Sequence, residues 1–226
     1  MNNVLPHITL ETGKSPQHSI IWLHGLGADG DDFVSIAEEM SLPVAIRYLF
    51  PHAPKQPVTI NGGLVMRAWY DITAFNVNAK QDVEGIRASQ AAIEALIAQE
   101  KQRGIVADNI FLAGFSQGGA IALHTGLRHK SRLGGILSLS SYLLQVETLS
   151  SEASAAALDI PIFMAHGNSD QVVTYTRGID SADELKKRGY QVDWHQYSMQ
   201  HSVCPEEVRD IQTWLTHKLN TKPYIP

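Results

Sequence analysis

The stretch Asn109-Ile110-Phe111-Leu112-Ala113-Gly114-Phe115-Ser116-Gln117-Gly118 decides the fold of this 226-residue chain. Its first half is a short apolar run typical of a buried strand, and the residues after it, Gly119 to Leu123, predict the start of a helix. A serine in a G-x-S-x-G turn between strand and helix is held strained and exposed, where it can meet a base and a substrate carbonyl. We interpret Ser116 as a nucleophile. An ordinary glycine-rich turn between core elements is the alternative.

Apolar runs alternate with amphipathic stretches along the chain on both sides of this motif. The pattern predicts strands at 19–23, 44–50, 109–113, 135–140, 160–165 and 191–197, and helices at 33–40, 82–103, 117–129, 147–158, 175–188 and 205–219. Residues 51–79 are rich in Pro, Gly and Asn and predict a long irregular excursion. Such alternation predicts an α/β fold with a mostly parallel, doubly wound sheet, helices on both faces and no separate cap domain. We expect residues 1–226 to form a single domain.

Composition and charge exclude several classes of protein. The formal net charge is −5 and no long basic run is present, which argues against nucleic-acid binding. The chain has one cysteine, Cys204, so no internal disulfide can form. No apolar run approaches the roughly 20 residues of a membrane span, and residues 1–7 do not resemble a signal peptide. We expect a cytoplasmic protein without stable membrane insertion.

A serine nucleophile needs an imidazole to take its proton and a carboxylate to orient that imidazole. His201 lies in the loop between the last predicted strand and the last predicted helix, and Asp170 follows the strand at 160–165. Both positions are at the carboxyl ends of strands, where ligands bind in sheets of this kind. We therefore predict Ser116, Asp170 and His201 as the catalytic residues. His195 is a weaker candidate for the base because it lies inside a strand.

Acyl transfer on a serine also requires backbone N–H groups that stabilise an oxyanion. One donor normally belongs to the residue after the nucleophile, which is Gln117. The other normally comes from an earlier loop between strand and helix that opens with an HG motif. His24-Gly25-Leu26-Gly27 fits this place, and we predict the Leu26 N–H as the second donor.

Two alternative sites would need a cofactor or a metal. Gly25, Gly27 and Gly30 form a literal G-x-G-x-x-G, but acidic residues crowd the following helix start, and no acid ends the next strand to bind a ribose. A zinc site made of His24, His166 and His201 would lack the short ligand spacings of zinc motifs. We therefore expect neither a cofactor nor a metal, and we expect His166 to be a hydrogen-bonded structural residue.

These motifs together resemble the carboxylesterase/acyl-protein thioesterase family, small esterases of the α/β-hydrolase fold. The segments that carry the resemblance are Ile21 to Gly30, Phe50 to Pro54, Pro57 to Gly63, Met66 to Asp71, Gly114 to Gly119 and the loops of Asp170 and His201. The Met66 to Asp71 segment is more similar to the bacterial members. The resemblance implies hydrolysis of esters or thioesters with apolar acyl chains, the same triad and oxyanion donors, and frequent dimers. Small esters and acylated lipids or proteins are the substrates it suggests.

The segment from Pro57 to Phe75 is too apolar for a solvated loop. Apolar side chains on a flexible excursion near an active site suit an acyl-chain groove or a partial lid, and Leu64, Met66 and Trp69 are the candidates. Alternatively these side chains cover the sheet edge, and Trp69 to Asp71 return to the core with Asp71 as an anchor.

Two alternative functions remain. A lysophospholipase would use the same catalytic mechanism on a different substrate. A non-catalytic ligand-binding scaffold is the more remote alternative, because neither the triad nor the turn glycines are broken.

Overall fold

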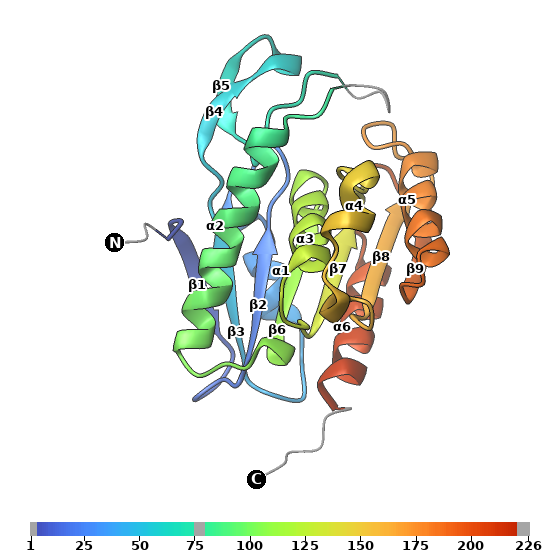
Figure 1. Ribbon diagram of the computed structural model, residues 1–226. Coiled ribbons are helices and arrows are strands. Elements are labelled where there is room, and N and C mark those ends of the chain that lie inside the picture. Colours follow the sequence, from blue (N-terminus) through green and yellow to red (C-terminus); the bar gives the residue numbers. More distant parts are fainter. Residues whose placement is uncertain (1–3, 75–79, 221–226) are drawn as a thin grey trace.

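The computed structural model describes residues 4–74 and 80–220. Within them a sheet of seven strands has the order β1-β3-β2-β6-β7-β8-β9 (Figure 1). Its strands are β1 (His7–Glu11), β2 (His18–Leu23), β3 (Ile46–Pro51), β6 (Ile110–Phe115), β7 (Gly135–Leu139), β8 (Ile162–Gly167) and β9 (Val192–Tyr197). All neighbouring strands are parallel except β1, which pairs antiparallel with β3. The mostly parallel sheet expected from the alternation of elements is therefore present.

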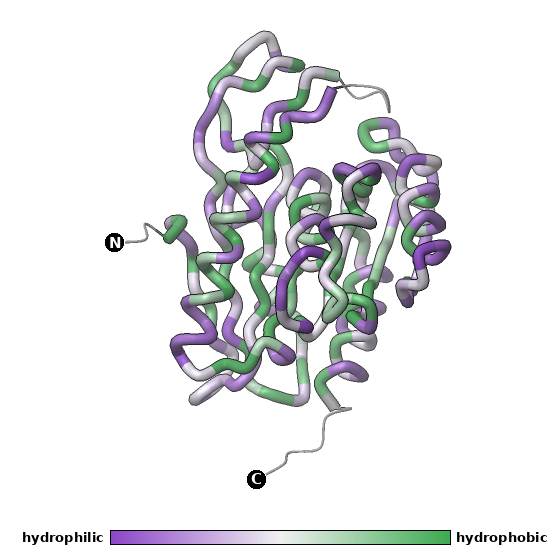
Figure 2. The backbone as a smooth tube through the Cα atoms, viewed as in Figure 1, coloured by the Kyte–Doolittle hydropathy of each residue, from purple (hydrophilic) through white to green (hydrophobic). Residues whose placement is uncertain are grey.

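Helices cover both faces of the sheet. The helices are α1 (Val34–Glu39), α2 (Val83–Gln102), α3 (Gln117–Arg128), α4 (Val146–Glu152), α5 (Tyr175–Lys187) and α6 (Pro205–Asn220). In Figure 1, α2 to α5 lie in front of the sheet, and α1 and α6 lie behind it. Each face of the sheet has its own hydrophobic core, and the side chains of β2 alternate between them. Ile21 and Leu23 pack with α2 and α3, whereas Ile20 and Trp22 pack with α1 and α6. Successive side chains of a strand point to opposite faces, so strands buried on both sides are apolar at most positions. Figure 2 shows this as hydrophobic strands beneath helices whose outer faces are hydrophilic.

The excursion after β3 is more regular than we expected. It contains an antiparallel hairpin of β4 (Lys55–Val58) and β5 (Leu64–Arg67) at the upper end of the molecule in Figure 1. The Asp71 carboxylate accepts hydrogen bonds from the Thr59 N–H at 2.7 Å and the Thr59 hydroxyl at 2.5 Å, which closes the base of the hairpin. The prediction of an irregular segment was therefore wrong, whereas the alternative role of Asp71 as an anchor agrees with these bonds. Residues 75–79 of the predicted excursion lie outside the described residues.

The parallel strands end at the same edge of the sheet, the upper edge in Figure 1. The loops after β2, β6, β8 and β9 meet there, and they hold the four sequence motifs singled out above. No helix within residues 4–74 and 80–220 combines the length and the apolar character needed to cross a bilayer.

Candidate active site

Ser116 occupies the sharp turn between β6 and α3. Its φ of 54° and ψ of −119° place a non-glycine residue in a strained region of the backbone. A Cβ on Gly114 would lie 2.4 Å from the Gly118 backbone, and one on Gly118 would lie 2.4 Å from the Leu23 carbonyl oxygen. Only glycine fits at these two positions, because strand, turn and helix cross in direct contact. The strain is held by the surrounding structure, including a 2.8 Å bond from the Ser116 N–H to the Leu139 carbonyl.

Ser116, His201 and Asp170 form one chain of hydrogen bonds. The Ser116 hydroxyl donates to Nε2 of His201 at 2.9 Å, and Nδ1–H of His201 donates to Oδ2 of Asp170 at 2.7 Å. The imidazole ring packs against Phe115, with ring centroids 4.7 Å apart. This tautomer leaves Nε2 free to accept the serine proton, as a general base must. The structure brings together all three residues that the sequence nominated.

Buried donors hold the Asp170 carboxylate in place. Its Oδ1 accepts the N–H groups of Val172 at 2.8 Å and Val173 at 3.0 Å. Nε2 of His166 lies 3.3 Å from its Oδ2 and donates to the Val173 carbonyl at 2.8 Å. Burial lowers the pKa of His166, so this ring is neutral near pH 7. His166 is thus the hydrogen-bonded structural residue that we expected. His195, the alternative base, lies on β9 against Asp193 and Asp210 instead.

His24 organises the loop that holds the predicted oxyanion donor. Its Nδ1–H donates to the Gly25 carbonyl at 2.7 Å, and its Nε2 accepts the Ala53 N–H at 3.0 Å. Burial lowers the pKa of His24 to about 4, so the ring is neutral and both nitrogens are occupied. His24 therefore does not join His166 and His201 in a metal site. In the described parts of the chain no group of three His, Cys, Asp or Glu residues could hold a metal ion.

A cleft of about 210 Å³ opens beside Ser116 and His201. Leu26 and Gln117, the predicted oxyanion residues, both line it. Its apolar wall consists of Leu26, Ala28, Ile72, Phe115, Tyr142, Val172 and Val173. Sequence reasoning did not nominate Ile72, Tyr142, Val172 or Val173. Position alone offered a signal for Val172 and Val173, since they follow Asp170 directly at the same sheet edge.

The three residues predicted to contact the acyl chain, Leu64, Met66 and Trp69, lie in different environments. Trp69 is 1% exposed, does not line the cleft, and donates from its indole Nε1–H to the His24 carbonyl at 2.9 Å. Its placement corrects our expectation, because an apolar side chain near a site can equally be buried beneath it. Leu64 is 63% exposed on β5. Met66 lies beside the oxyanion loop, with its sulfur 3.7 Å from where a Cβ on Gly27 would be.

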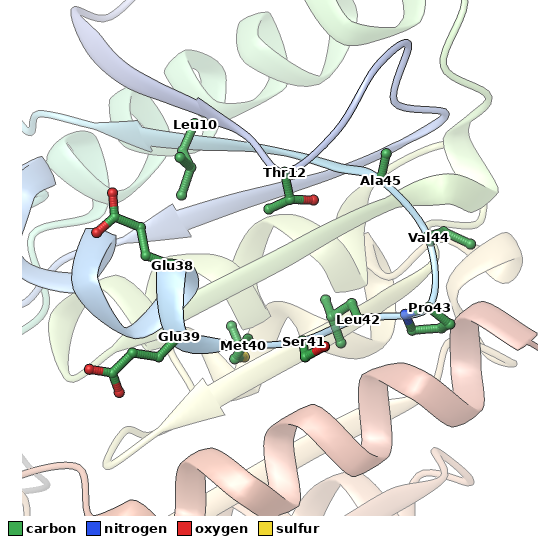
Figure 3. A pocket seen from close by; sticks show the side chains of 10 residues that line it. All are labelled: Leu10, Thr12, Glu38, Glu39, Met40, Ser41, Leu42, Pro43, Val44 and Ala45. Atoms are coloured by element: carbon green, nitrogen blue, oxygen red, sulfur yellow. The ribbon is translucent and has the colours of Figure 1, made fainter.

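A larger cavity lies elsewhere, at the amino end of β3 (Figure 3). It measures about 630 Å³ and is lined by Leu10, Thr12 and residues 38–45. Glu38 and Glu39 are its only charged lining residues, and the lining includes no histidine or cysteine. Size therefore does not identify the reactive site in this protein. The smaller cleft holds the paired serine and imidazole.

Comparison with known proteins places this geometry in a family. The profile of the Phospholipase/Carboxylesterase family matches residues 6–219. The chain belongs to this family. Acyl-protein thioesterase 1 of Yarrowia lipolytica is 40% identical to this hydrolase over 223 residues, which is 95% of the present chain and 97% of the relative. Acyl-protein thioesterase 1 of Neurospora crassa is 41% identical over 212 residues, covering 89% and 86% of the two chains.

Solved structures agree with the family and the fold. Zea mays acyl-protein thioesterase 2 superposes with a TM-score of 0.83 at 33% identity, over 94% of this chain and 99% of that one. Arabidopsis thaliana SOBER1 superposes with a TM-score of 0.85 at 31% identity, over 90% and 99%. This member of the Phospholipase/Carboxylesterase family has the α/β-hydrolase fold and is a serine hydrolase of esters or thioesters.

Proposed function

We propose that this hydrolase cleaves esters or thioesters of apolar acyl chains, carried by small molecules, lipids or proteins, through an acyl-enzyme on Ser116. The observation that carries the proposal is the unbroken set of hydrogen bonds from Ser116 through His201 to Asp170 at the mouth of an apolar cleft. The names of the relatives add support for thioesters of acylated proteins. One domain over residues 1–226 supplies the whole site.

The first half of the reaction forms the acyl-enzyme. Oγ of Ser116 attacks the substrate carbonyl carbon while Nε2 of His201 takes the hydroxyl proton. The Asp170 carboxylate stabilises the imidazolium through the 2.7 Å bond to Nδ1–H. The backbone N–H groups of Leu26 and Gln117 donate to the oxyanion of the tetrahedral intermediate. Loss of one such donor typically costs about 100- to 1000-fold in rate.

The second half releases the acid. His201 protonates the leaving alcohol or thiol as the tetrahedral intermediate collapses, which leaves the acyl group on Ser116. The same imidazole then removes a proton from water, and the hydroxide attacks the acyl carbonyl. A second oxyanion forms in the same place and collapses to free acid and Ser116. The cycle consumes water and needs no cofactor or metal.

The acyl chain lies along the apolar wall of the cleft in this proposal. Ile72 and Val173 supply buried apolar surface in the cleft beside Ser116, and the partly exposed Val172 lines the same cleft. Met66, beside Gly27, and the exposed Leu64 extend that surface toward the hairpin. Residues 57–74, the described part of the segment, then contribute to acyl binding as a groove or partial lid, while Trp69 supports them from the core.

Replacement of Ser116 by Ala tests the proposal. We expect hydrolysis of p-nitrophenyl butyrate to fall by about a million-fold, going by a comparable serine triad. A fluorophosphonate probe should label the wild type and not the variant. Full esterase activity in a folded Ser116→Ala protein would refute the assignment, and a wild type that never reacts with the probe would favour a non-catalytic scaffold.

Substrate class needs a separate comparison. A lysophospholipase would use the same cleft, so lysophosphatidylcholine, a palmitoyl-peptide thioester and p-nitrophenyl esters of increasing length should be compared by kcat/KM. A higher value for the thioester supports a protein thioesterase, and a higher value for the lysolipid supports the alternative. A homodimer and a cytoplasmic location stay predictions, to be checked by light scattering and by cell fractionation.

A further inference from the structure

The two predicted oxyanion donors lie on different segments, and one short stretch of chain touches both. Leu26 lies in the loop after β2, and Gln117 is the first residue of α3. The segment Arg67–Tyr70 contacts the first loop on either side of Leu26. The Gly27 N–H donates to the Arg67 carbonyl at 2.9 Å, and the Trp69 Nε1–H donates to the His24 carbonyl at 2.9 Å. The peptide groups before and after the Gly25–Leu26 peptide, which carries the Leu26 N–H, are therefore both tied to this segment.

The side chain of Gln117 ties the same segment to the nucleophile turn. Its Oε1 accepts the Trp69 N–H at 2.8 Å, and its Nε2–H donates to the Tyr70 carbonyl at 2.7 Å. The side chain is 1% exposed. An amide is both donor and acceptor, so it can satisfy two backbone groups as a neighbouring strand would. Gln117 thus has two separable parts: the backbone N–H that we predict as an oxyanion donor, and a side chain that bonds to residues 69 and 70.

We infer that Arg67–Tyr70 is a template that sets the separation of the Leu26 and Gln117 donors, with the Gln117 side chain and Trp69 as positioning residues. This inference rests on the proposed function. The loop at Leu26 lies between Gly25 and Gly27, and the φ of Gly27 is +80°. The Nδ1–H of His24 donates to the Gly25 carbonyl at 2.7 Å and so orients the peptide that carries the Leu26 N–H, but this bond lies within the loop and does not tie it to residue 117. Oxyanion donors act only within a narrow range of geometry, and a misplacement of about 1 Å can cost about 100-fold in rate.

The template is itself rigidly held. The Trp69 carbonyl accepts a hydrogen bond from the Ser89 hydroxyl on α2. The Tyr70 hydroxyl bonds to the Tyr142 hydroxyl at 2.7 Å, and Tyr142 lines the cleft. The side chains of Trp69 and Tyr70 are 1% and 3% exposed. These contacts anchor the template to α2 and to the segment between β7 and α4, in addition to its bonds with the two oxyanion segments.

Gln117→Met tests the inference because it keeps the backbone N–H and the length of the side chain but loses both amide bonds. We expect kcat for p-nitrophenyl butyrate to fall about 10- to 100-fold with KM changed less than about threefold. Affinity for an alkyl trifluoromethyl ketone, whose adduct with Ser116 carries an oxyanion, should fall by the same factor as kcat/KM. A merely structural role would lower the melting temperature without this parallel loss.

Gln212→Met is the matched control. The Gln212 side chain on α6 accepts the Ser41 N–H at 3.0 Å, a bond of the same kind remote from the cleft. This variant should keep the wild-type kcat and ketone affinity. Unchanged kcat and ketone affinity in a folded Gln117→Met protein would overturn the inference. If Ser116→Ala is inactive in the same assays, that result leaves the proposed function intact.

Trp69→Phe provides a second variant in case Gln117→Met does not fold. It removes the indole N–H that donates to the His24 carbonyl and keeps a smaller aromatic ring at this buried position. We expect a roughly 3- to 10-fold parallel loss of kcat/KM and ketone affinity, with KM nearly unchanged. A loss confined to KM would instead indicate an effect on substrate binding, and it would contradict the positioning role.

Discussion

Nε2 of His201 lies 2.9 Å from Oγ of Ser116, although 85 residues separate the two in the chain. Their loops follow β9 and β6, which are three strands apart in the sheet and hence roughly 14 Å apart. The His201 loop closes this gap by crossing the end of β8, where the Ser169 N–H donates to the Met199 carbonyl at 3.1 Å. A Cβ on Gly167 would lie 2.4 Å from the Gln200 carbonyl oxygen. The base therefore reaches the nucleophile because the last residue of β8 has no side chain.

Asp170→Asn should leave the fold intact and lower kcat by about 10,000-fold. The amide cannot accept from Nδ1–H of His201 as a carboxylate does, so the imidazole loses its favoured tautomer and its counter-charge. Steady-state hydrolysis of p-nitrophenyl butyrate measures the effect. Asp183→Asn, at an exposed position on α5, is the control and should match the wild type. Equal kcat values for the two variants would remove Asp170 from the mechanism.

Gly118→Ala should impair both folding and activity. The added Cβ would lie 2.4 Å from the Leu23 carbonyl oxygen, so β2 and the nucleophile turn must separate. We expect a loss of about 1–3 kcal/mol in the free energy of unfolding and a fall in kcat of about 100-fold. Urea denaturation and esterase kinetics measure the two effects.

Gly104→Ala is the control for Gly118→Ala, because it introduces backbone strain without a steric clash. Gly104 has a φ of +96° after α2, and no atom lies within 4 Å of an added Cβ. The Gly104→Ala protein should be less stable than the wild type but should keep the wild-type kcat. A Gly118→Ala protein with wild-type kcat would show that the tight crossing does not position Ser116.

Val172→Thr should weaken the preference for long acyl chains. Val172 lines the cleft and is 44% exposed, and threonine keeps its shape while replacing a methyl group by a hydroxyl. Loss of that apolar contact costs about 1 kcal/mol, or about fivefold in kcat/KM, for an octanoyl ester. The acetyl ester should be unaffected, because it is too short to reach the side chain. Val106→Thr, at a position 60% exposed and outside the cleft, serves as the control. A uniform loss for both esters would argue against an acyl contact.

Glu207→Gln should change how stability depends on pH. Glu207 is fully buried in the first turn of α6, and burial raises the pKa of its carboxyl from 4.5 to about 8, although the Cys204 backbone N–H opposes the shift. The folded protein thus keeps a proton that the unfolded chain releases. The stability contribution is complete below pH 4.5 and is lost as the pH rises through about 8, by about 1.4 kcal/mol per pH unit.

Glutamine mimics the protonated carboxyl and has no proton to lose. Urea denaturation should find Glu207→Gln close to the wild type at pH 4.5 but more stable at pH 8, by about 2–5 kcal/mol. The exposed neighbour supplies the control, since Glu206→Gln should follow the wild type at both pH values. Parallel curves for Glu207→Gln and the wild type would contradict the buried, protonated state.

Much of the fold could be predicted because parallel strands buried on both faces are apolar at most positions. β2, β6 and β8 are of this kind, and their predicted bounds differ from the observed ones by at most two residues. β1 was not predicted, because this edge strand has only Ile8 and Leu10 as apolar residues between polar ones. The hairpin was missed because β4 contains Lys55, Gln56 and Pro57, which weaken any strand pattern.

Part of the candidate site could likewise be predicted from the sequence, and part could not. Ser116, Asp170 and His201 could be nominated because each follows a recognisable strand, and the ends of parallel strands converge at one edge. Trp69 could not be placed, because apolarity predicts that a side chain leaves water but not whether it lies in the core or under a ligand. The two hydrogen bonds of the Gln117 amide to residues 69 and 70 could not be predicted from the sequence, because both partners are backbone groups, 48 and 47 residues away.

The sequence by itself determined the chemistry: a serine on a glycine-flanked turn, an acid and a base in order at strand ends, and an HG loop. Residue type and chain order carry that information. Only the tertiary structure decided the cleft wall, the depth of Trp69 and the bonds that join the oxyanion loop to the nucleophile turn. Those depend on where loops cross and which way side chains point, and these directions are set by packing between segments distant in the chain.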